Sequence, residues 1–206
     1  MKTPIPFRLL SLPLSILLLG CLTAFAQGNA GPKIESSYEV VLQLIVGSNE
    51  AVEGVALPPN LRSVSSQLKN NFGFANYRLE NTFVGRIAAN GTFDYRSVSN
   101  SFGSGVDTET PSFLEWTLGR LQSSVDDKGQ ASIQAQPFRF GAKVPIKVSS
   151  LADGGTKTIA NITYEPIGLT VNQVSLAQNT PTLIGTLSLP KTAGTIFLVL
   201  TVRPAN

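Results

Sequence analysis

Residues Tyr38–Val46 read YEVVLQLIV and are followed directly by Gly47. Four of these nine residues are β-branched, which favours an extended backbone. Neighbouring side chains in a strand point in opposite directions, so the apolar residues of this run fall on both faces. A strand that is apolar on both faces is covered on both sides. We therefore expect a buried, central strand here.

The period of the apolar residues changes after Pro58-Pro59. Four apolar side chains then recur at helical spacing, on one face of about 80°: Leu61, Val64, Leu68 and Phe72. Asn60 is a suitable N-cap, and Gly73 can take the left-handed conformation that often ends a helix. This pattern predicts the one helix of the chain after its leader.

Period-two alternation dominates the rest of the chain. Tyr77, Leu79, Phe83 and Ile87 alternate with polar residues, which predicts a strand with one buried face. Asn90-Gly91 predicts a two-residue type I′ hairpin that returns as Thr92–Val98, with Phe93 and Tyr95 on one face. The remaining strands are expected at 113–125, 131–140, 143–149, 157–164, 169–176, 182–189 and 195–202, with turns at 126–129 and 153–155.

These elements predict a mainly β fold, an antiparallel sandwich or barrel-like sheet stack with one helix inserted after the first strand. The alternative is an α+β module in which the strand–helix–strand opening makes the first two strands parallel. Residues 38–206 are expected to form a single β-rich domain after a flexible lead-in at 27–37. The polar stretch Ser97–Ser112 is expected to be a long loop, either disordered or an interaction surface.

Residues 1–26 have the three parts of a secretory signal peptide. Lys2 and Arg8 form a basic start, an apolar run follows, and Ala24-Phe25-Ala26 supplies a cleavage site. We expect export to the periplasm or the extracellular space. The alternative is an outer-membrane lipoprotein, because Leu18–Cys21 resembles a lipobox; membrane association is expected only if Cys21 is lipidated.

Composition excludes several classes of chemistry. The chain has no His, and its single cysteine, Cys21, lies in the expected leader. Ser-His-Asp and Cys-His catalysis, imidazole or thiolate metal sites and disulfides are therefore not expected, and neither is any cofactor. Without the leader, 14 basic residues face 13 acidic ones, so the net charge of +3 falls to +1. Nucleic acid is accordingly not an expected partner.

Ser66 and Lys69 match the S-x-x-K pattern, in which a lysine can activate a serine without histidine. Lys191-Thr192 comes close to the second motif of the same enzymes. A small serine hydrolase that uses Ser66 and Lys69 is thus the alternative function, but an exposed helix face is the simpler explanation, because so short a pattern arises by chance.

Other candidate groups have structural explanations. Asp126-Asp127 suits a hairpin turn, and Asp107 with Glu109 offers at most a weak calcium site. Trp116, the only tryptophan, is expected to anchor the core. Three arginines interleave with aromatic residues, as in single-strand nucleic-acid binders, but the period places the two sets on opposite faces: Arg78, Arg86 and Arg96. No catalytic, cofactor-binding or metal-binding residue is therefore assigned.

The C-terminal region has a recognisable order: a strand at Val171–Leu176, a polar turn that leads to Gly185, and a final apolar strand at Phe197–Pro204. It resembles the closing strands of bacterial secretins, the outer-membrane channels of secretion systems. This resemblance implies an accessory or truncated envelope protein with an envelope or secretion-system partner. We therefore expect a non-enzymatic, exported binding or assembly module.

Overall fold

The computed structural model describes residues 36–49, 57–99, 110–125, 127, 129–152, 157–189 and 194–205, with the backbone alone at 149–152 and 157–160. The chain divides into the units Met1–Ile34 and Glu35–Asn206, and all described residues belong to the second. The expected signal peptide, most of the lead-in and the turn at 153–155 lie outside the described residues. Within those ranges, no helix is long and apolar enough to cross a membrane.

The described chain is mainly β, as predicted, and forms three antiparallel sheets. The first sheet has the order β10-β11-β1-β2, with bounds Thr182–Ser188, Thr195–Pro204, Ser37–Ser48 and Asn76–Ala88. Strand β1 is central and buried, which confirms the expectation from its sequence. It runs antiparallel to β2, so the parallel alternative is wrong.

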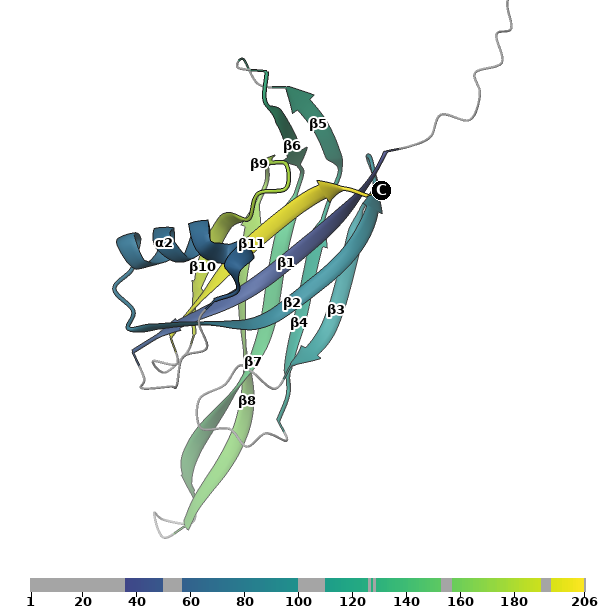
Figure 1. Ribbon diagram of the computed structural model, residues 1–206. Helices are drawn as coiled ribbons and strands as arrows, with labels where there is room; N and C mark the ends of the chain where they lie inside the picture. Colours follow the sequence, from purple (N-terminus) through teal and green to yellow (C-terminus); the bar gives the residue numbers. More distant parts are fainter. Residues whose placement is uncertain are drawn as a thin grey trace, which may run out of the picture. The chain divides into compact units, whose positions relative to one another are not determined.

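The second sheet has the order β3-β4-β7-β8, with bounds Phe93–Ser99, Ser112–Leu118, Phe138–Ala152 and Lys157–Val171. A third, smaller sheet contains β5 (Leu121–Val125), β6 (Ala131–Ala135) and β9 (Val174–Ala177). Figure 1 shows the first two sheets lying against each other, with β5 and β6 beyond one end of them. The main core fills the space between these sheets, with Leu42 and Leu44 on one side and Leu114 and Trp116 on the other.

Several strand boundaries differ from the predictions. The predicted strand 113–125 is divided at Gly119, where a Cβ would overlap the carbonyl oxygen of Gln136. The predicted strand 131–140 is divided at Gln136-Pro137, so each half can join a different sheet. Conversely, β7 and β8 each run through 15 residues without a break. The ends of the predicted loop Ser97–Ser112 belong to β3 and β4, and its residues 100–109 lie outside the described part of the chain.

The predicted type I′ hairpin at Asn90-Gly91 is wrong, because β2 and β3 belong to different sheets. A type I′ turn needs a positive φ at both central residues, and here only Asn90 has one, at 62°. The backbone N–H of Asn90 instead donates to Leu121 O at 3.3 Å. The chain therefore turns a corner at this point and passes from one sheet to the other.

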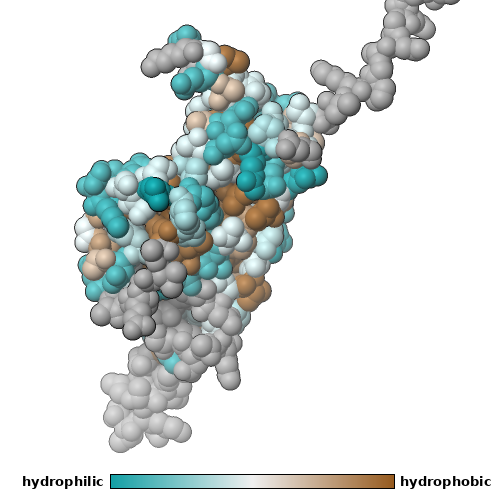
Figure 2. Space-filling model, in the orientation of Figure 1, coloured by the Kyte–Doolittle hydropathy of each residue, from teal (hydrophilic) through white to brown (hydrophobic). Residues whose placement is uncertain are grey.

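The predicted helix is present as a 3₁₀ turn η1 (Pro59–Leu61) followed by α2 (Arg62–Asn71). Its buried residues Leu61, Val64 and Leu68 form a second cluster on the outer side of the first sheet, where α2 lies across β11 and β1 (Figure 1). Figure 2 shows that the surface of this region is largely hydrophilic. The predicted caps are wrong: no side chain caps the first turn, because the 3₁₀ turn begins directly after Pro58.

Tyr77 takes over the role expected of Gly73 at the other end of the helix. Phe72 already has an extended conformation, with φ −132° and ψ 131°, and Gly73 has no positive φ. The Tyr77 hydroxyl lies 2.7 Å from Phe72 O and 3.0 Å from Leu68 O, so its single proton can be donated to either carbonyl group. A side chain from the following strand thus supplies a hydrogen-bond donor to the backbone carbonyl groups at the C-terminal end of the helix.

A β-bulge in β2 overturns the prediction of one buried face. Leu44 is paired with Asn81 and Ile45 with Leu79, which leaves Glu80 as an extra residue. Side chains on the two sides of a bulge change faces. Tyr77 therefore packs against the helix, whereas Phe83 and Ile87 belong to the main core.

Candidate binding groove

The geometry does not support the alternative in which Ser66 and Lys69 form a catalytic dyad. Both side chains are exposed on α2. The Ser66 hydroxyl donates to Arg62 O at 3.1 Å, within its own helix. A serine that is activated by a lysine needs a hydrogen bond to it, and none joins these two residues. Lys191 and Thr192 lie outside the described residues.

The carboxylate candidates are not brought together. Asp107, Glu109 and Asp126 lie outside the described residues, and Asp127 is exposed between β5 and β6. Gly129 in this connection has φ 76°, as a hairpin turn requires. Among the described residues, no three acidic or sulfur side chains lie close enough to hold a metal ion.

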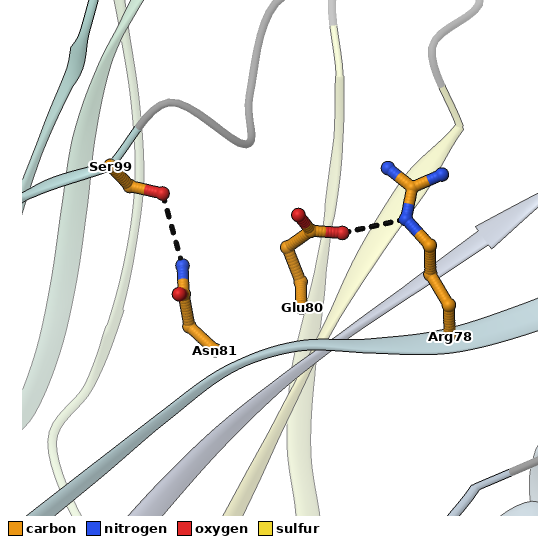
Figure 3. A network of polar contacts seen from close by, with 4 residues as sticks. All are labelled: Arg78, Glu80, Asn81 and Ser99. Carbon is orange, nitrogen blue, oxygen red and sulfur yellow. Dashed lines mark hydrogen bonds and ion pairs between the residues drawn. The ribbon is translucent and has the colours of Figure 1, made fainter. Parts of the chain in front are cut away.

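The period predicted that the three arginines share one face, and this is wrong. The bulge places Arg78 beside Val46, on the interior side of the sheet. Arg78 forms an ion pair with Glu80, with Nε and Oε2 2.6 Å apart. Beside this pair, Asn81 Nδ2 donates to Ser99 Oγ at 3.1 Å and so links β2 to β3 (Figure 3).

Trp116 is a core residue, as predicted, with 1% of its surface exposed. The rings of Phe93, Tyr95 and Phe138 surround it at centroid distances of 4.8, 6.3 and 6.5 Å. Its Nε1 has no hydrogen-bond partner among the described residues. Trp116 is thus unavailable to a ligand outside the sandwich.

A groove that was not predicted lies on the second sheet, on the face turned away from the core. Leu114, Trp116 and Phe140 point inward, so the residues between them point outward. The groove has a volume of about 640 Å³, and four apolar outward residues line it: Val98, Phe113, Tyr164 and Pro166. It spans all four strands of this sheet, or roughly 14 Å from β3 to β8. We call it the outer groove.

Two rings form the apolar part of the outer groove. The centroids of Phe113 and Tyr164 are 5.6 Å apart, with their planes at 55°. Phe113 is 46% exposed, Tyr164 41% and Val98 58%. The removal of large apolar side chains from water lowers the free energy of the system. This cluster is therefore available for contact with another apolar surface.

Charged residues and a glycine complete the outer groove. Arg96 and Glu115 face each other across β3 and β4, with Nε and Oε2 3.9 Å apart, and both side chains are largely exposed. Gly141 is the next residue in this cross-strand row. A Cβ at Gly141 would lie 3.3 Å from Glu115, so the missing side chain keeps the floor low. Lys143 is exposed between Phe113 and Pro166.

A signal for the outer groove is present in the sequence. In Phe113–Leu118 the inward positions are Leu114, Trp116 and Leu118, so Phe113 is an apolar residue at an otherwise polar position. On β8, Tyr164 is likewise an exposed apolar residue, next to the exposed Ile162 on the same side of the strand. A single exposed apolar residue does not indicate a binding site. Phe113 and Tyr164 come together only through the pairing of β4, β7 and β8, which the sequence does not display.

Comparisons with known proteins identify no family. No family model matches the chain, and no curated protein matches it. A solved structure, the InvG secretin domain β-barrel from the Salmonella SPI-1 injectisome NC-base, is similar over 94% of this chain and 67% of that chain. The sequence identity is 10% and the TM-score 0.30. This is a weak structural resemblance, and we draw no functional conclusion from it.

Proposed function

We propose that this chain is an exported, non-enzymatic protein of a bacterial envelope that acts as a binding or assembly module. The outer groove is the observation that carries this proposal. Its exposed side chains Val98, Phe113 and Tyr164 contribute little to the core, yet they gather in one place on the sheet. Clustered apolar side chains on a soluble surface are typical of interaction sites.

The chemistry of the groove favours binding over catalysis. Ser97 contributes to the lining, but its hydroxyl donates to Val98 O at 3.3 Å. Arg96 and Glu115 form an exposed pair with each other. These groups can orient a bound surface, and none of them is placed as an activated nucleophile.

Location and partner class rest on the sequence. The leader at 1–26 predicts export, and the resemblance of residues 171–204 to secretins suggests a partner in a secretion or outer-membrane complex. Mass spectrometry of the protein from its native envelope tests the location: a free N-terminus at Gln27 is expected. A lipid on Cys21 would instead establish the lipoprotein alternative.

Site-specific photo-cross-linking in living cells tests the binding role. A photoreactive amino acid replaces Val98 in the groove or, as a control, Val84 on β2, which has the same exposure within one per cent. We expect a discrete cross-linked species from position 98 that disappears in the Phe113→Ser background, and none from position 84. Equal products from both positions, or none from either, would contradict the proposal. Ester hydrolysis that is lost on Ser66→Ala would establish the enzymatic alternative.

A further inference from the structure

Positive charge is concentrated along the middle of the face that carries the outer groove. Outward positions on β7 alternate with the buried Phe138, Phe140, Ala142 and Val144. Three of these outward residues are basic: Arg139, Lys143 and Lys147. They are four residues apart, which corresponds to about 13 Å along a strand. Arg139 and Lys143 are exposed.

In the described strands, this face carries more basic than acidic side chains. The register places four cations on it, since Arg96 of β3 adds to the three of β7. Its outward acids within the described strands are Asp94 and Glu115, which leaves a net charge of +2. The chain without its leader carries only +1. Over the described strands, the net charge of this face is therefore larger than that of the chain without its leader.

The apolar and basic groups lie close together. In one cross-strand row, Val98, Phe113, Lys143 and Pro166 are successive neighbours. Lys143 thus lies between an exposed aromatic ring and a proline. A group that fills the space over Phe113 would bring any adjacent carboxylate close to Lys143, where the partly desolvated surroundings strengthen the attraction.

The hollow shape of the surface favours a protein segment over a lipid bilayer. A protein binds the surface of a bilayer through apolar side chains that insert at the boundary between headgroups and acyl chains, which requires them to protrude. Here the missing side chain of Gly141 lowers the floor, and the apolar groups line a space of about 640 Å³. Such a space accepts side chains that protrude from a partner, as when an amphipathic segment lies in a groove.

We propose that the outer groove docks an acidic, amphipathic segment of a protein partner. Apolar side chains of that segment fill the space over Phe113 and Tyr164, and its carboxylates meet Lys143 and Arg139. This inference rests on the proposed binding function and specifies the chemistry of the partner.

Synthetic peptides test the charge requirement with the purified protein. Three labelled 16-residue peptides share the same Leu and Phe positions and carry Glu, Gln or Lys at the others. Fluorescence anisotropy is expected to show at least tenfold tighter binding of the Glu peptide than of the Gln peptide in 50 mM NaCl, and a smaller ratio in 500 mM NaCl.

Matched variants locate the binding site. The double variant Arg139→Gln/Lys143→Gln is expected to bind the Glu peptide about tenfold more weakly than the wild type does, and to bind the Gln peptide with unchanged affinity. Arg62→Gln/Lys69→Gln removes the same charge from α2 and serves as the control. Val98→Ser is expected to weaken the binding of both the Glu and the Gln peptide, and Val84→Ser is expected to leave the binding of both unchanged.

Other occupants are distinguishable outcomes. Equal binding of the Glu and Gln peptides would overturn the acidic partner, while cross-linking from position 98 would still support the binding function. Preferential binding to phosphatidylglycerol vesicles, or a dimer in sedimentation that Val98→Ser dissociates, would replace the peptide with a membrane or with a second copy. A failure of both peptide binding and cross-linking would overturn both proposals.

Discussion

The hydroxyl of Tyr77 in β2 lies 2.7 Å from the carbonyl oxygen of Phe72, just beyond the end of α2. The only α-helix among the described residues is thus held to the sheet by a side chain of the strand that follows it. Tyr77 also packs against Phe197, with ring centroids 5.9 Å apart. The hydrogen bond and the ring contact hold the same end of the helix in place.

Tyr77→Phe keeps the ring and removes the hydroxyl. We expect the free energy of unfolding to fall by about 1–2 kcal/mol, because the part-buried carbonyl group of Phe72 loses the hydroxyl as its partner. Urea denaturation of wild type and variant measures this difference. Tyr164→Phe, at an exposed ring, is the control and should change stability by less than about 0.5 kcal/mol. Equal stability of the Tyr77→Phe variant and the wild type would show that the hydrogen bond adds nothing.

Alkaline pH tests the same residue. Burial raises the pKa of Tyr77 above its ordinary value of 10.0. The folded state therefore holds this proton more tightly than the unfolded state, so the associated stability is complete below pH 10 and is lost as the pH rises through the folded pKa. Stability measured from pH 8 to 11 should fall less steeply in Tyr77→Phe than in the wild type. Parallel curves would contradict this assignment.

Two glycines allow the facing sheets to approach at their edges. A Cβ at Gly85 would overlap the ring of Phe93, and one at Gly185 would overlap Leu169. Gly85→Ala is expected to destabilise the fold by about 1–3 kcal/mol, because the sheets must separate to make room. Gly73→Ala is the control, since no atom lies within 4 Å of the added Cβ. Thermal unfolding should separate the two variants, and equal melting temperatures would contradict the close approach.

The outer groove should be dispensable for folding. Phe113→Ser removes an exposed ring, so the melting temperature should change little, while binding of an apolar dye should decrease. Val125→Ser, at the 69% exposed end of β5, is the control for the dye measurement. A large loss of stability in Phe113→Ser would mean that this ring supports the sheet rather than a partner.

The single tryptophan reports on the core directly. Trp116 is surrounded by rings, so its emission should be blue-shifted in the folded protein and protected from acrylamide. Trp116→Ala is expected to cost about 3–5 kcal/mol, the usual range for a large buried aromatic residue. Strong quenching of the folded protein would contradict its buried position.

Local patterns predicted much of this fold correctly. The strand Tyr38–Val46 and the helix that contains Val64 and Leu68 depend on side chains of neighbouring residues, which the sequence displays directly. The mainly β architecture follows from the number of such strands. These features need no knowledge of which strands lie side by side.

Features that depend on strand pairing were not predictable. The bulge at Glu80 exists only relative to β1, and the period of the residues around it looks uninterrupted. The corner at Asn90 has a typical hairpin sequence. However, the backbone N–H groups of Ala89 and Asn90 donate hydrogen bonds to Ser36 O and Leu121 O, and the chain passes to another sheet. The outer groove likewise requires the side-by-side pairing of the four strands of the second sheet, so no single segment shows it.

The bulge at Glu80 has a counterpart in β10, where Leu183 is paired with Val199 and Gly185 with Leu198, so that Ile184 is the extra residue. Both edge strands of the first sheet thus carry one residue more than their partners. Deletion of either residue would shift the strand beyond it by one position, as a frameshift shifts a reading frame. Each side chain beyond the deletion would then move to the opposite face of the sheet, so that helix-facing and core-facing residues would change places. The tolerance of this protein to insertions and deletions should therefore be lowest at these two positions.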